Sequence, residues 1–152
     1  LLDGVPHLGI EHVGSTSVPG LAAKPRLDID VVVERGNLAS ACDALAAGGY
    51  EPLGEMGVTD RWAFRAPADG VDRNTYVVVA GSLALRDHLG LRDTLRARPD
   101  LRDEYAAVKT ALAGRTDDID EYVAGKTAVI LEVLRVAGIP EDELAELERI
   151  NT

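Results

Sequence analysis

Two aspartates, Asp28 and Asp30, stand on either side of one isoleucine and shortly follow the pair Gly14-Ser15. Side chains alternate between the faces of a strand, so two acids in this spacing point the same way. Paired carboxylates can share one hard cation through their oxygen atoms. We therefore predict that Asp28 and Asp30 are Mg²⁺ ligands. The alternative is a pair of solvated acids at the end of a strand.

Gly14, Ser15 and Ser17 form the second part of this pattern. A turn built from glycine and serine offers backbone N–H groups and hydroxyls to a phosphate. Glycine also allows a tight turn or the close approach of a ligand. Taken alone, the segment is equally typical of a polar turn. Ahead of Asp28 and Asp30, it predicts that these three residues bind the phosphates of a nucleotide.

The stretch from His12 to Pro25, together with the strand that carries Asp28 and Asp30, resembles the GrpB family, a branch of the nucleotidyltransferase superfamily. Later blocks are similar in order and spacing, namely Leu91 to Arg96, Tyr105 with Lys109, and Lys126. The resemblance covers residues 9–137 and implies a nucleotidyltransferase-like fold. It also implies that Asp28 and Asp30 are catalytic residues, with a nucleoside triphosphate and a small-molecule acceptor as partners.

The chain has 13 arginines but three lysines, Lys24, Lys109 and Lys126, and all three lie in blocks that resemble the family. A lysine ammonium is a compact charge with rotatable donors, which suits a phosphate. We expect Lys24 and Lys126 to bind the nucleotide. For Lys126 the alternative is that its stem covers apolar helix surface.

Composition limits the classes of function. A chain of 152 residues with 46% hydrophobic residues predicts one globular domain over residues 1–152. The formal charge of −10 argues against an extended nucleic-acid surface, which needs a basic stripe. No apolar run approaches the ~20 residues of a membrane span. A single cysteine, Cys42, fits a reducing compartment, so we expect a cytoplasmic protein without a membrane partner.

The order of the predicted elements defines the fold class. The valine-rich runs at 26–33 and 75–80 predict strands, and further strands are expected at 9–13, 50–53 and 61–66. Apolar periodicity with glycine and proline breaks predicts helices up to Ala47, over 82–98, from Pro99, and in two further segments that end the chain. Strands first and helices afterwards predict an α+β fold, with a mixed β-sheet in the N-terminal half packed by a helical C-terminal half.

Active enzymes of the superfamily that this chain resembles place a third acid on a later strand, and residues 75–79 contain none. Asp60 is the nearest substitute. Two functions therefore stay open. One is Mg²⁺-dependent transfer of a nucleotidyl group to a small acceptor. The other is a non-catalytic nucleotide-binding or accessory domain, as implied by GrpB-like domains that are fused to dephospho-CoA kinase.

Overall fold

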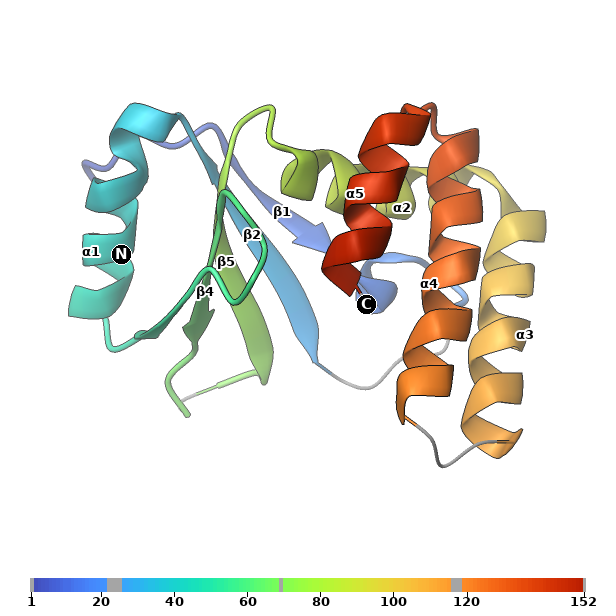
Figure 1. Ribbon diagram of the computed structural model, residues 1–152. Coiled ribbons are helices and arrows are strands. Elements are labelled where there is room, and N and C mark those ends of the chain that lie inside the picture. Colours follow the sequence, from blue (N-terminus) through green and yellow to red (C-terminus); the bar gives the residue numbers. More distant parts are fainter. Residues whose placement is uncertain (1, 22–25, 69, 116–118, 152) are drawn as a thin grey trace. The chain divides into compact units, whose positions relative to one another are not determined.

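The computed structural model describes residues 2–21, 26–68, 70–115 and 119–151. Its contacts group the chain into two compact units, Leu1–Ser17 with Ala23–His88, and Val18–Ala22 with Leu89–Thr152. The first unit carries the sheet and the second is helical (Figure 1). The predicted α+β class is confirmed. That the two units form one domain over residues 1–152 stays a prediction.

The first unit contains one mixed sheet, and five strands lie in the part of the chain that is described. Their order is β1-β2-β5-β4-β3. β2 and β5 are parallel, and the other neighbours are antiparallel. The bounds are β1 Gly9–Val13, β2 Leu27–Val33, β3 Glu51–Gly54, β4 Arg61–Arg65 and β5 Arg73–Val79. β5 begins two residues before the predicted strand because its pairing with β2 continues to Leu27 and Arg73.

The central strands are valine-rich because they are buried. Val33, Val77 and Val78 are 0% exposed, and β-branched side chains pack well on a pleated surface. One face of the sheet forms a core with helix α1, Leu38–Ala47, through Ala41 and Leu45. In Figure 1, α1 runs beside the sheet. Two short 3₁₀ turns, η1 Ser15–Ser17 and η2 Arg35–Asn37, precede β2 and α1 respectively.

The second unit is built from helices α3 Pro99–Arg115, α4 Ile119–Val136 and α5 Glu141–Asn151, with most of α2, Leu83–Ala97. α4 packs against both α3 and α5 (Figure 1). Buried members of its core include Leu95, Leu101, Tyr105, Val129 and Val133. Among the residues that the structure describes, none of the helices has the length and apolar character needed to cross a membrane.

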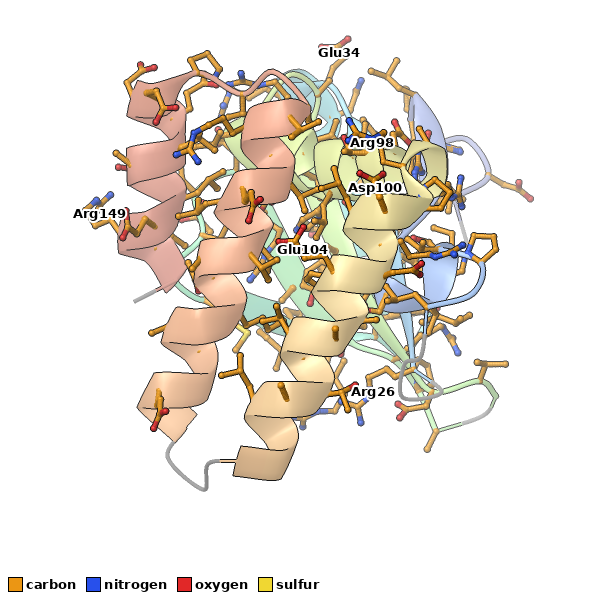
Figure 2. The ribbon with its side chains drawn as sticks, turned by 90° about the vertical axis from the view of Figure 1, so that its right-hand side faces the viewer. Arg26, Glu34, Arg98, Asp100, Glu104 and Arg149 are labelled. Carbon is orange, nitrogen blue, oxygen red and sulfur yellow. The ribbon has the colours of Figure 1, made fainter. Side chains whose placement is uncertain are left out.

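Pro99 separates α2 from α3, as its missing N–H and fixed φ predict. Arg98 and Asp100 flank it, and their side chains form an ion pair with Nη2 and Oδ2 2.8 Å apart (Figure 2). Both side chains are largely exposed, so water screens the pair and it contributes little to stability. The junction therefore depends on the proline and on the apolar stripes of the two helices.

Two valines of α4 test this packing as a matched pair. Val133 is 1% exposed and Val136 is 49% exposed. We expect Val133→Ala to lower the free energy of unfolding by about 2 kcal/mol, because it removes buried methyl groups and leaves a cavity. Val136→Ala should change it by less than about 0.5 kcal/mol. Chemical denaturation measures both, and equal losses would contradict the assigned face of α4.

Candidate functional site: a carboxylate pair on the central strands

Asp28 and Asp30 lie on one face of β2, as predicted. Their partners across the parallel pairing are Asn74 and Tyr76 of β5. Asp28 is half-buried, whereas Asp30 is 0% exposed. The two acids therefore share a face but differ in environment, because Asp30 sits deeper along the strand.

Asp28 is held between β5 and the glycine turn. The Asn74 side-chain amide donates to Asp28 Oδ1 at 3.0 Å. Gly14 has φ +75°, and a Cβ atom placed on it would lie 2.2 Å from Asp28 Oδ2. Residue 14 must therefore be glycine for two reasons, its backbone conformation and the carboxylate against which it packs.

The turn after Gly14 is closed by Ser17. Its backbone N–H and its hydroxyl both donate to the carbonyl oxygen of Gly14, and Ser17 is 4% exposed. His12 Nε2 and Thr16 Oγ1, 2.8 Å apart, tie β1 to the same turn. Ser17 thus shapes the turn in this structure, and Ser15 begins η1. Phosphate contacts from Gly14, Ser15 and Ser17 stay a prediction.

Asp30 is paired with His88, a residue of α2 within the first unit. His88 Nδ1 lies 2.6 Å from Asp30 Oδ2, and the His88 side chain is 18% exposed. The other oxygen, Asp30 Oδ1, is buried and has no hydrogen-bond partner among the described residues. A buried carboxylate oxygen without a partner is costly, so this atom is a candidate ligand for a cation.

Further charged groups surround this pair. The Arg61 guanidinium lies over the Tyr76 ring, 4.6 Å from its centroid, and the Tyr76 and His88 rings are 6.0 Å apart. Burial raises the pKa of the Asp87 carboxyl, although the charges of His88 and Arg61 oppose that shift. Burial also raises the pKa of the Tyr76 hydroxyl. The site therefore combines acids with compensating cations.

The carboxylates fit a divalent cation that completes its coordination from another source. Asp28 and Asp30 share a face, and Asp30 Oδ1 is buried without a hydrogen-bond partner among the described residues. Asp60 does not supply a third ligand, because its Oδ1 lies 3.0 Å from Arg35 Nη2 in an ion pair. In the described ranges no three His, Cys, Asp or Glu side chains gather closely enough to hold a metal.

The structure does not test the two predicted lysines at this site. Lys24 is outside the described residues. Lys126 belongs to the second unit, where it is half-buried. Burial, followed by the charge of Lys126, lowers the pKa of Lys109, whose Nζ lies 5.2 Å from the centroid of the Tyr105 ring. The two lysines are thus neighbours, and nucleotide contacts by Lys24 and Lys126 stay predictions.

Sequence reasoning missed Asn74 and His88. Asn74 reaches Asp28 because of the register between two strands that lie 46 residues apart in the chain. His88 reaches Asp30 from a helix 58 residues away. The small number of histidines, three in the chain, was one signal that His88 could matter. Nothing in the residues around His88 indicates a carboxylate partner.

The mixed sheet, the helical second unit and the carboxylate pair define an α+β protein with a nucleotidyltransferase-like fold. The GrpB protein family model matches residues 1–135, and the chain belongs to this family. A crystal structure of the conserved protein GrpB from Enterococcus faecalis is similar, with a TM-score of 0.72 and 32% identity. The match covers 90% of this chain and 82% of that one.

Curated relatives carry the name UPF0157. The UPF0157 protein YqkA of Bacillus subtilis is 37% identical over 114 residues, which cover 74% of this chain and 33% of that protein. A UPF0157 protein of Streptomyces coelicolor is 42% identical over 104 residues, covering 68% of this chain and 54% of the relative. The chain thus spans between a third and about half of the length of these relatives.

Gly14→Ala tests the contact between the turn and Asp28. We expect it to lower the free energy of unfolding by more than Gly81→Ala does. Gly81 has a similar φ of +74° but no atom within 4 Å of an added Cβ. The positive φ alone costs about 1–3 kcal/mol in either variant. The additional loss of unfolding free energy in Gly14→Ala, compared with Gly81→Ala, measures the displacement of Asp28. If thermal unfolding gives equal losses for the two variants, the Asp28 carboxylate does not pack against residue 14.

The Asp30–His88 pair predicts a pH dependence of stability. Burial, the largest single influence, lowers the pKa of His88, but the hydrogen bond and charge of Asp30, with the charge of Asp87, raise it above its ordinary value of 6.5. The folded state therefore binds this proton more tightly than the unfolded state. The resulting stability is fully present below pH 6.5 and is lost as the pH rises through the folded-state pKa.

We expect the free energy of unfolding to fall with rising pH above 6.5 in the wild type. Each tenfold preference for the proton in the folded state contributes about 1.4 kcal/mol. His88→Gln should flatten this slope, whereas His7→Gln, at an exposed histidine, should keep it. Urea unfolding at several pH values gives the slopes. Parallel slopes for the wild type and His88→Gln would contradict the assignment.

Proposed function

We propose that this chain binds a nucleoside triphosphate together with Mg²⁺ at Asp28 and Asp30, beside the Gly14–Ser17 turn. The observation that carries the proposal is the buried Asp30 Oδ1, which lacks a partner among the described residues and lies on the face that Asp28 shares. A cation there would satisfy the orphaned oxygen and offset two neighbouring negative charges.

The small number of protein ligands suits Mg²⁺. This ion keeps several waters and is commonly held by one or two carboxylates plus the phosphates of a substrate. When bound, it would neutralise charge that develops on the phosphates. The fold would supply the two carboxylates, and the nucleotide would supply the remaining oxygens.

The other residues position these ligands. The amide of Asn74 fixes one oxygen of Asp28, and Gly14 leaves space for the other. His88 holds Asp30 through Oδ2, which leaves Oδ1 for the cation. Such partners orient a ligand and tune its basicity, so they contribute to affinity without touching the ion.

Positive charge on the phosphate side would come from Lys24 and Lys126. With a net charge of −10, local cations beside the phosphates would offset the repulsion between an acidic chain and a nucleotide. The basis for this assignment is their positions in blocks that resemble the family.

Two activities are compatible with this site. One is transfer of a nucleotidyl group to a small-molecule acceptor. The other is nucleotide binding without turnover, and it is favoured because Asp60, the substitute that the sequence offers for a third acid, is held in an ion pair with Arg35. Pyrophosphate release from ATP in the presence of small acceptors distinguishes them. Release that requires both a small acceptor and the two acids Asp28 and Asp30, with the nucleotidyl group recovered on the acceptor, would establish transfer.

Nucleotide binding itself is tested by thermal shift with and without Mg²⁺. Ligand at one hundred times Kd stabilises the folded state by about 2.7 kcal/mol. We expect Asp28→Asn combined with Asp30→Asn to abolish the Mg²⁺-dependent stabilisation by ATP. The control carries the same charge change at two exposed acids, Asp43→Asn with Asp142→Asn, and should respond like the wild type. An unchanged response in the first double variant would refute the proposed site.

A further inference from the structure

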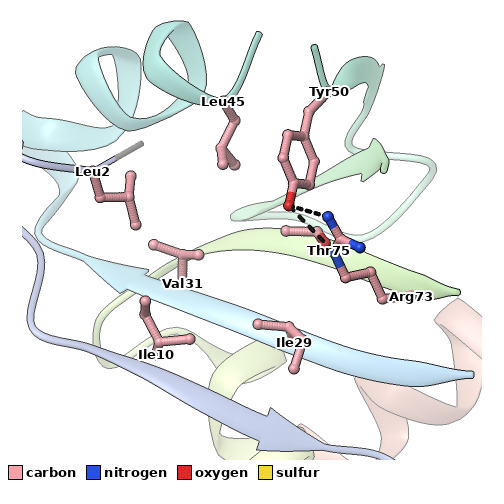
Figure 3. A pocket seen from close by; sticks show the side chains of 8 residues that line it. All are labelled: Leu2, Ile10, Ile29, Val31, Leu45, Tyr50, Arg73 and Thr75. Carbon is pink, nitrogen blue, oxygen red and sulfur yellow. Dashed lines mark hydrogen bonds between the residues drawn. The ribbon is translucent and has the colours of Figure 1, made fainter. Parts of the chain in front are cut away.

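A cavity lies on the opposite face of the sheet from the carboxylate pair. It has a volume of about 310 Å³, and its walls are the aliphatic side chains of Leu2, Ile10, Ile29, Val31 and Leu45 (Figure 3). Ile29 and Val31 alternate with Asp28 and Asp30 along β2, so they project to the other side. This cavity and the carboxylate site therefore share a strand but no surface.

One end of this cavity is polar. Arg73 Nε and Nη2 both donate to the hydroxyl oxygen of Tyr50, at 3.2 and 2.8 Å, and Nη1 donates to the carbonyl of Val71 at 2.8 Å. Figure 3 shows the Arg73 and Tyr50 side chains meeting at the wall of the cavity. Since the Tyr50 oxygen accepts two hydrogen bonds, its own O–H remains a donor. The guanidinium supplies positive charge beside it.

Thr75 adds a second donor at the same end. It lies on β5 one alternation beyond Arg73, lines the cavity and is 4% exposed. Its Oγ1 is buried and has no hydrogen-bond partner within the described part of the chain. Buried hydroxyls are nearly always paired, so an unpaired one that lines a cavity points to a group that enters the cavity.

We propose that this cavity binds a small monocarboxylate with an apolar body. The hydroxyls of Tyr50 and Thr75, beside the Arg73 cation, would receive the carboxylate, and the aliphatic walls would contact the hydrocarbon part. The volume is at the lower end of the range for small-molecule sites, about 300–1,000 Å³. Most of the lining is aliphatic and offers no polar partner to a ribose, so a ligand with an apolar body fits this cavity better than a nucleotide does.

Hexanoate is a suitable probe, with hexanol as the neutral analogue and hexylamine as the cationic one. Calorimetric titration of the wild type should give the order hexanoate, hexanol, hexylamine, from tightest to weakest. Tyr50→Phe and Thr75→Val should each weaken hexanoate about tenfold or more, because each removes a hydrogen bond to a charged group. Thr75→Ser keeps a hydroxyl and should remain within about threefold of the wild type.

The controls separate binding from folding and from the nucleotide site. Thr127→Val makes the same exchange at a buried threonine of the second unit and should leave hexanoate binding unchanged. Unliganded Thr75→Val should be at least as stable as the wild type, because it removes an unsatisfied hydroxyl. Asp28→Asn combined with Asp30→Asn should bind hexanoate normally, so this proposal does not depend on the proposed nucleotide site.

Three results would overturn the proposal. The first is no binding of hexanoate to the wild type at millimolar concentrations. The second is equal affinity for hexanoate and hexanol, which would leave an apolar cavity without an anion site. The third is unchanged hexanoate affinity in both Tyr50→Phe and Thr75→Val. If Thr75→Val is destabilised, the hexanoate affinity of Tyr50→Phe alone decides whether the third result holds. A destabilised Thr75→Val would also contradict the unpaired state of Thr75 Oγ1.

Discussion

The parallel pairing of β2 with β5 is the constraint on which the other features depend. Its register places Asp28 beside Asn74 and Ile29 beside Thr75, so one face receives the acids and the other receives the cavity. A slip by one residue would exchange the two faces of a strand. Val33 and Val77, both fully buried, fix the register because neither can move to a polar surface without losing its apolar contacts.

Buried polar atoms without partners are concentrated in the first unit. Within the described residues they are Asp30 Oδ1, Arg61 Nε and Thr75 Oγ1, and each lies on a strand of the sheet. Such atoms cost stability, and natural proteins keep them mainly where a ligand or a chemical role compensates. Their distribution agrees with two proposed binding sites, one on each face of the sheet.

Asp30 shows how the fold accommodates a buried charge. Removing a carboxylate from water is expensive unless it is paired and hydrogen-bonded. His88 meets this need at one oxygen, and Arg61 contributes positive charge nearby through its position over Tyr76. The second oxygen is the atom to which the proposed cation would bind. The same residue would then contribute both to stability, through His88, and to the proposed function.

Much of this arrangement could be predicted from the sequence. Val31 to Val33 predicted a buried strand, the spacing of Asp28 and Asp30 predicted a shared face, and Gly14 predicted a special backbone conformation. These are local signals. The partnership of Asp28 with Asn74 could not be predicted, because it follows from long-range register.

The contact of His88 with Asp30 and the cavity also depend on residues that lie far apart in the chain, so they could not be predicted either. His88 lies on a helix whose packing brings it to Asp30, and nothing in the residues around it indicates that approach. The cavity combines residues from both ends of the first unit, from Leu2 to Thr75, so no short motif marks it. Asp60 was the nearest acid in sequence to a missing third ligand, yet its partner is Arg35.

The central claim is that a divalent cation and a nucleotide meet at Asp28 and Asp30, and paramagnetic broadening by Mn²⁺ tests it most directly. In amide NMR spectra recorded with a non-hydrolysable ATP analogue, Mn²⁺ should selectively broaden the signals of Gly14, Asp28, Asp30 and Asn74. The effect should weaken without the nucleotide. Broadening centred on the acidic first turn of α5, Glu141 to Glu143, with these four signals unaffected, would contradict the account.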